Sequence, residues 1–159
     1  MTSSSSASRG GRLRALQRDL KRAAGLGLTG WGDLLRAVAE LAVARWRLGT
    51  QGTRQLLAGA KTDDPPAISV LSQDGDALVN RVAFAIPRVG QRVPWRADCL
   101  VQALAAQHWL GRRGVATTLV IGVDKPGPAD FAAHAWLMAD DRIVTGGQVA
   151  QFHPIFRQS

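Results

Sequence analysis

The hydrophobic pattern of the chain changes at about residue 114, and this change limits the fold more than any other feature. Before it, apolar residues recur at helical spacing from Cys99 to Arg113, and Gly114 stands where a helix commonly ends. After it come a segment rich in β-branched residues at 115–123 and two further short strand-like segments, separated by a loop at 124–130 and a turn at 139–141. The predicted strands are 115–123, 131–138 and 142–145. A helix followed by an antiparallel meander indicates an α+β fold.

The first half of the 159-residue chain has a helical pattern throughout. Residues 1–10 are low in complexity and are expected to form a disordered tail. Helices are predicted at 11–24, 31–48 and 76–86, the last ending at Pro87, with breaks at 25–32 and 62–67. The expected apolar face of the second helix comprises Trp31, Leu34, Leu35, Val38, Leu41, Ala42 and Trp46. We expect this helical region, 11–92, to pack against a core formed by 93–159, giving one compact domain.

The net charge of +8 is concentrated in the first 60 residues, which carry +7. Such a basic region can bind nucleic acid, an acidic membrane surface or an acidic protein, or can be a solvated helix face. The sequence has no zinc-finger or RNP-like motif, so specific nucleic-acid recognition is not favoured. It also has no membrane-spanning apolar stretch and no apolar core of a secretory signal, and we therefore expect a cytoplasmic protein.

Cys99 is the only cysteine, which excludes an internal disulfide and a Cys-rich metal site. It lies at the predicted start of a helix, with Asp98 or Ala97 as the N-cap residue. The free N–H groups and the dipole of a helix N-terminus favour a thiolate, and the same N–H groups can stabilise an oxyanion. A lone cysteine is more commonly a core residue, so both a nucleophilic and a packing role fit this position.

A nucleophilic thiol also needs an imidazole, and the three histidines are not equally placed to supply it. His108 lies nine residues along the same helix, roughly 13.5 Å from the thiol. His153 falls in what reads as a C-terminal tail, a poor position for a precisely held base. His134 lies within a predicted strand that can pack on the Cys99 helix, which gives a papain-like arrangement. A structural role in the strand is the alternative for His134.

Three segments in order, WRADCLVQALAAQHWLGRRG, LVIGV and FAAHAW, resemble the leader peptidases of lasso-peptide biosynthesis, a transglutaminase-like cysteine protease family. The resemblance covers about residues 94–147 and implies a transglutaminase-like core with Cys99 as nucleophile and His134 as general base. It further implies cleavage of the leader from a lasso precursor peptide, together with a separate leader-binding protein and a lasso cyclase. We expect the leader-binding protein to dock on the basic helices at 11–24 and 31–48.

The chain departs from this family at the residue that orients the histidine. The family usually has an Asp twelve residues after the His, and here that position is Gly146. Asp140 and Asp141 lie at the predicted hairpin tip, roughly 20 Å from His134 at the rise of a strand. The remaining candidates are the side chain of Gln148, the side chain of Thr145, or a backbone carbonyl, each acting through a neutral hydrogen bond.

Two other functions use the same residues. A catalytically inactive transglutaminase-like scaffold for precursor and cyclase would explain Gly146, and a Cys–His acyl transferase or amidase would share the chemistry of the peptidase. We expect Trp95, Trp109 and Trp136 to fill the core or line a cleft, and Arg96 to be an exposed arginine beside a turn. The sequence has no metal-ligand cluster and no phosphate-binding glycine loop, so we infer no bound cofactor or metal.

Overall fold

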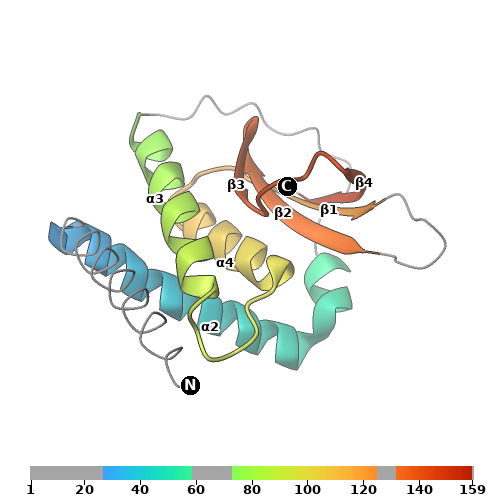
Figure 1. Cartoon of the computed structure of the whole chain (residues 1–159), viewed down its shortest axis with the longest axis horizontal. Coiled ribbons are helices and arrows are strands. Elements are labelled where there is room, and N and C mark those ends of the chain that lie inside the picture. Colours follow the sequence, from blue (N-terminus) through green and yellow to red (C-terminus); the bar gives the residue numbers. More distant parts are fainter. Residues whose placement is uncertain (1–26, 59–72, 125–131, 159) are drawn as a thin grey trace, which may run out of the picture. The chain divides into compact units, whose positions relative to one another are not determined.

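The computed structural model describes residues 27–58, 73–124 and 132–158. The chain forms two compact units, 1–32 and 33–159; the described residues of the first, 27–32, are the beginning of helix α2. All contacts given below lie within the second unit. Its elements are α2 (Gly27–Ala58), α3 (Gln73–Gly90), α4 (Cys99–Gly111), β1 (Thr118–Asp124), β2 (Ala133–Ala139), β3 (Arg142–Thr145) and β4 (Phe152–Gln158) (Figure 1). The segments predicted at 1–10, 11–24 and 62–67 lie outside the described residues, and the break predicted at 25–32 is helical from Gly27 onward.

The four strands form one antiparallel sheet in the order β3-β2-β1-β4, and the α+β prediction is confirmed. The predicted meander is present as β1, β2 and β3, with Gly122 of β1 opposite His134 of β2. Strand β4 was not predicted, and it pairs with the free side of β1, with His153 opposite Val123. The assignment of His153 to a C-terminal tail is therefore wrong. Pro154 is compatible with this strand because β4 is at the edge of the sheet, where a residue without an N–H can face solvent.

Helix α4 is the centre of the core. It contacts α3 and the three strands β1, β2 and β3. It also contacts α2, through an ion pair between His108 and Glu40 and through the Arg36 guanidinium, which lies over the Trp109 ring. Trp109 and Leu110 have no exposed surface, which confirms the core position expected for Trp109. No helix within the described ranges is long and apolar enough to cross a membrane.

The buried face of α2 differs from the predicted one. Of the predicted residues, Leu41 lies in the core and Leu34 packs against it, but Leu35 and Trp46 are 70% and 66% exposed, and Ala37 and Ala44 are buried in their place. The helix carries apolar residues on two faces, so periodicity alone does not select the buried one. The face with two alanines is the one that packs inward. Small side chains there allow the backbone of α2 to approach the core closely.

The prediction that the third helix ends at Pro87 is wrong, because α3 continues through Pro87 to Gly90. Proline lacks the N–H that would bond to the carbonyl four residues earlier, so one helical hydrogen bond is lost. The following turn is closed by Gln91 N–H to Pro87 O at 3.3 Å and Val93 N–H to Val89 O at 3.1 Å. With Val89 buried after Pro87, packing keeps this last turn helical.

The end of α4 confirms the position predicted for Gly114. The N–H of Val115 donates to Leu110 O at 3.2 Å, and the N–H of Gly114 donates to Gly111 O at 3.0 Å. This is the hydrogen-bond pattern of a Schellman motif, in which the residue after the helix adopts positive φ. Gly114 has φ +71°, a conformation that glycine adopts without steric cost.

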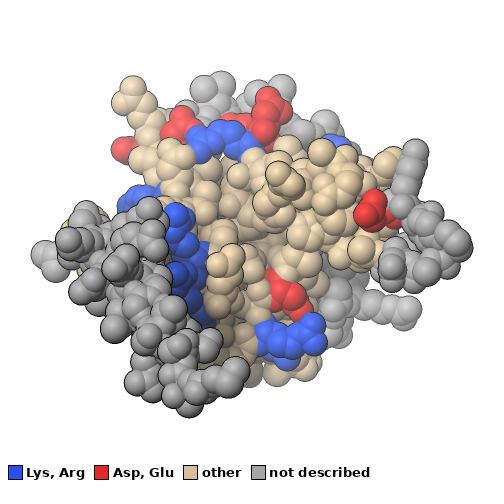
Figure 2. Space-filling view, in the orientation of Figure 1, with Lys and Arg blue, Asp and Glu red and all other residues tan. Residues whose placement is uncertain are grey.

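Ion pairs join the first helices to each other and to the sheet. Arg81 of α3 donates two hydrogen bonds to the Asp33 carboxylate of α2, at 2.7 and 2.5 Å, and these raise the pKa of the Arg81 guanidinium above its ordinary value. Arg142 of β3 donates to Asp76 at 2.9 Å and also to Asn80 of α3. On the face drawn in Figure 2, the largest group of basic side chains lies along the side of α3.

Candidate functional site

Cys99 is the first residue of α4 and is half-buried. Asp98 occupies the N-cap position, as one of the two predicted caps, but its exposed side chain makes no capping hydrogen bond. The segment before the thiol is instead held by Gln102, whose Nε2–H donates to the Ala97 carbonyl oxygen at 2.7 Å. The first turn of α4 thus carries the candidate nucleophile without a side-chain cap on its N–H groups.

His134 is the second residue of β2 and is also half-buried. Its Nε2 lies 2.7 Å from the Gly146 carbonyl oxygen. A carbonyl oxygen only accepts hydrogen bonds, so Nε2 carries the proton and donates it. In the neutral ring the lone pair then belongs to Nδ1, and this nitrogen can take a proton.

Aromatic rings fix the plane of the His134 imidazole. The Phe152 ring of β4 stacks on it with centroids 4.8 Å apart and planes inclined by 24°. Trp136, two residues along β2, lies with its centroid 6.3 Å away and its plane inclined by 23°. Gly122 of β1 makes room for these rings, because a β-carbon there would lie 2.7 Å from Trp136 Cη2. The sequence analysis did not select Phe152. Gly122 is the signal that could have pointed to these rings, because a glycine within a strand is a recognised sign of close approach by another group.

The residue at position 146 is restricted to glycine by its surroundings. Gly146 has φ +109°, and a β-carbon there would lie 2.4 Å from Trp136 Cβ and 3.3 Å from Ala135 O. Trp136 Cβ and Ala135 O are both fixed by the backbone, so neither atom can move away by a side-chain rotation. The conformation that directs the Gly146 carbonyl to His134 therefore excludes the Asp that the lasso leader peptidases usually have at this position.

Neither side chain considered as an orienting group bonds to His134. Thr145 is 2% exposed, and within the described part of the chain its Oγ1 has no hydrogen-bond partner. Gln148 is exposed. Of the three options that the sequence left open, the backbone carbonyl is the one that contacts the imidazole.

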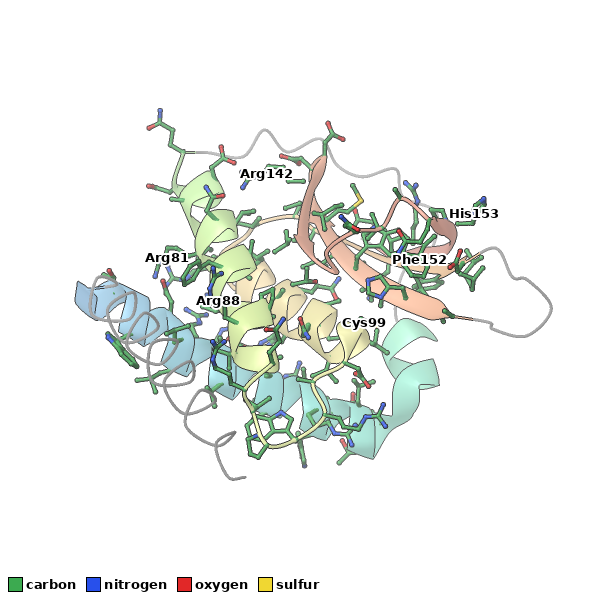
Figure 3. All side chains as sticks on the ribbon, viewed as in Figure 1. Arg81, Arg88, Cys99, Arg142, Phe152 and His153 are labelled. Atoms are coloured by element: carbon green, nitrogen blue, oxygen red, sulfur yellow. The ribbon has the colours of Figure 1, made fainter. Side chains whose placement is uncertain are left out.

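The two candidate catalytic residues come from elements that pack together and begin at the same end. Helix α4 contacts β2, and Figure 1 shows that both run in the same direction from the end where Cys99 lies. Figure 3 shows Cys99 and Phe152 toward that same end. Along β2, Leu137 and Ala139 belong to the helical core, so His134, at an alternating position, belongs to the opposite face of the strand. Among the described residues, no hydrogen bond joins the Cys99 thiol to His134.

The third histidine, His108, lies outside this group. Its Nδ1–H donates to Glu40 Oε2 at 2.7 Å, and Glu40, 7% exposed, also pairs with Arg36 at 3.5 Å. His108 therefore belongs to the α2–α4 contact, in agreement with its exclusion as a base. Arg96 is exposed, as expected. In the described ranges no group of three or more His, Cys, Asp or Glu residues is placed to hold a metal ion.

Comparison with known proteins gives one match. A family model for the transglutaminase-like superfamily matches residues 35–157, which include α4, the whole sheet, Cys99 and His134. Comparisons with curated proteins and with solved structures give no match. The matched region covers most of the chain and has the helix and antiparallel sheet described above. The chain belongs to the transglutaminase-like superfamily.

Proposed function

We propose that the protein is a cysteine peptidase that removes the leader from a lasso-peptide precursor, acting with a separate leader-binding protein and a lasso cyclase. The observation that carries this proposal is the hydrogen bond from His134 Nε2 to the Gly146 carbonyl, since it leaves Nδ1 free to act as a base. The position of Cys99 at an uncapped helix N-terminus supports its role as nucleophile. The similarity of residues 94–147 to lasso leader peptidases supplies the substrate class.

In the first step, substrate binding brings the Cys99 thiol and His134 Nδ1 within hydrogen-bond distance, Nδ1 takes the thiol proton, and the sulfur attacks the carbonyl carbon of the bond between leader and core peptide. The N–H groups of the first turn of α4 stabilise the negative charge on the carbonyl oxygen. The imidazolium then gives its proton to the leaving amine. The core peptide departs with a new N-terminus, and the leader remains on Cys99 as a thioester.

In the second step, His134 takes a proton from water, and the hydroxide attacks the thioester carbonyl. Collapse releases the leader with a free carboxyl group, and the proton returns to the Cys99 sulfur. If an amine replaced water, the same residues would perform acyl transfer, and with water and a simple amide as substrate they would perform amidase chemistry. The peptidase is favoured here because the sequence similarity is to leader peptidases.

The test combines purified protein, leader-binding protein and precursor, and follows the leader and core by mass spectrometry. Cys99→Ala is expected to abolish cleavage, because no other residue in the chain can form the thioester. His134→Ala is expected to lower turnover by several orders of magnitude, since the base and the ion-pair partner of the thiolate are lost together. A Cys99→Ala protein that still releases the core would contradict the proposal.

The partner requirement is tested separately in the same assay. Without the leader-binding protein, cleavage is expected to be slow, and efficient turnover of precursor alone would contradict this part of the proposal. If docking uses the basic residues of the first half of the chain, the stimulation by the partner should weaken as salt rises.

One observation favours a second candidate, an inactive scaffold that binds precursor and cyclase. The Gly146 carbonyl is neutral, so it orients the imidazole but stabilises the imidazolium less than a carboxylate would. A scaffold would bind the precursor and show no cleavage with any combination of partners. The wild-type protein in the assay above distinguishes the two candidates.

A further inference from the structure

Three exposed arginines lie along the part of the chain that leads from the end of α3 to Cys99. Arg88 lies in the last turn of α3, Arg92 follows in the turn after it, and Arg96 stands three residues before Cys99. We call Arg88, Arg92 and Arg96 the arginine track. Figure 3 shows Arg88 near the end of α3, from which residues 91–98 run to Cys99.

The first two guanidinium groups are held in place by uncharged neighbours. The Arg88 guanidinium lies over the Phe84 ring, 3.6 Å from its centroid, and its Nη1–H donates to the Phe84 carbonyl at 3.1 Å. Arg92 Nη1–H donates to the Arg88 carbonyl at 2.9 Å. These contacts order the side chains and leave other N–H groups of each guanidinium free to bind a carboxylate.

The track is not neutralised within the described part of the chain. The described ion pairs use Arg36, Arg81, His108 and Arg142, and no carboxylate there pairs with Arg88, Arg92 or Arg96. Arg81 lies seven residues, about two helical turns, before Arg88 on the same side of α3. By contrast, it is paired with Asp33. Of the arginines of α3, the one that stays unpaired, Arg88, is therefore the one closer in sequence to the candidate nucleophile.

The end of α3 also packs against the beginning of α4. A β-carbon at Gly90 would lie 3.0 Å from the Gln102 side chain, and Gln102 holds the carbonyl of Ala97 just before the thiol. The arginine track is thus attached to the first turn of α4 by direct contact. A peptide bound along the track would be fixed relative to Cys99.

We infer that the arginine track binds an acidic segment of the peptide that is cleaved at Cys99. This inference rests on the proposed peptidase function. It predicts that the peptide substrate carries Asp or Glu side chains at a distance from the scissile bond. Carboxylates bind guanidinium groups through paired, charge-assisted hydrogen bonds. The track would therefore contribute to substrate binding and leave the chemical step unchanged.

The binding experiment uses the full chain carrying Cys99→Ala, so that its outcome does not depend on catalysis. The probe is a fluorescein-labelled dodecapeptide of alternating Glu and Ser, and its matched analogue has Gln in place of Glu. Anisotropy is measured for the parent and for R88Q/R92Q, with R112Q/R113Q as the control pair of equal charge change. Arg112 and Arg113 are exposed and follow the opposite end of α4. Circular dichroism checks that each variant keeps the parent's helical content and Tm.

We expect R88Q/R92Q to weaken binding of the Glu peptide by about 3- to 30-fold, the effect of removing two exposed charge pairs. The control pair and the Gln peptide should show little change. Equal binding by R88Q/R92Q and the parent, or equal losses in both pairs of variants, would overturn the inference. With Cys99 restored and the precursor as substrate, R88Q/R92Q should raise KM at constant kcat. Two results separate this inference from the proposed peptidase function. If R88Q/R92Q loses Glu-peptide binding and the wild type does not cleave the precursor, the arginine track is supported and the peptidase is refuted. If the wild type cleaves the precursor and R88Q/R92Q changes neither KM nor peptide binding, the peptidase is supported and the arginine track is refuted.

Discussion

Replacing Gly146 by alanine should destabilise the protein strongly, and the size of the effect follows from two features of the structure. The residue has φ +109°, outside the range that L side chains prefer, which costs about 1–2 kcal/mol. The added β-carbon would lie 2.4 Å from Trp136 Cβ, and relieving such a contact in a packed region typically costs about 1–3 kcal/mol more. The free energy of unfolding should therefore fall by about 2–5 kcal/mol, equivalent to a Tm lower by roughly 6–15 °C in a chain of this size.

The matched control is Gly147→Ala. Gly147 also has positive φ, +66°, but a β-carbon there has no other heavy atom within 4 Å. Its substitution should cost only the backbone strain, about 1–2 kcal/mol. Thermal and urea denaturation followed by circular dichroism measure both variants. If Gly146→Ala were no less stable than Gly147→Ala, the close packing of Gly146 against Trp136 would be refuted. For the same reason, Gly146→Asp should lower both stability and cleavage and should not reproduce the carboxylate of the lasso leader peptidases.

Three further predictions concern single side chains. Phe152→Leu should lower kcat by about 2- to 12-fold at constant KM, the equivalent of losing one aromatic stacking contact on the imidazole; Phe152→Tyr should retain activity, and equal kcat values in the wild type and Phe152→Leu would argue against a positioning role. Thr145→Val should leave turnover unchanged and change the free energy of unfolding by at most about 1 kcal/mol in either direction, because the buried hydroxyl has no partner among the described residues; a large loss of turnover would show that this hydroxyl orients the base. Asp33→Asn should cost about 1 kcal/mol in urea denaturation, a modest value since the Arg81 side chain is 52% exposed; an unchanged midpoint would show that the pair is fully screened.

The features predicted well from the sequence are those with local causes. Helix α4 starts at Cys99, directly after the N-cap residue Asp98, and ends before Gly114, where glycine adopts positive φ without steric cost. Both positions can be read from a few neighbouring residues. Strands β1 and β3 follow from runs of β-branched residues, and β2 follows from its position between a segment with Gly and Pro and the turn at 139–141.

The features that were missed depend on contacts distant in the sequence. Helix α3 passes through Pro87 because Val89 is buried beyond it, and local propensity contains no information about that burial. Strand β4 has a proline and little alternation, and it exists because the edge of β1 offers a partner. The buried face of α2 was assigned incorrectly because two apolar faces compete and only packing against α4 selects between them.

The candidate site divides in the same way. Cys99 and His134 were selected from residue type and predicted element, both of which are properties of the sequence. The group that holds His134 is a backbone carbonyl, and every residue has one, so no residue type marks it. The Phe152 stacking partner comes from the strand that was not predicted.

We propose that His134 activates Cys99, and the rate at which the thiol is alkylated measures this activation. Cys99 is the only cysteine, so the iodoacetamide incorporated, measured by intact mass, reports on this residue alone. A free thiol is only a few per cent thiolate at pH 7, so a thiolate held by an imidazolium should react about ten times faster or more. We predict that wild-type protein at pH 7 is alkylated at least about tenfold faster than His134→Ala, with both variants folded. Equal alkylation rates in the two proteins would contradict the account.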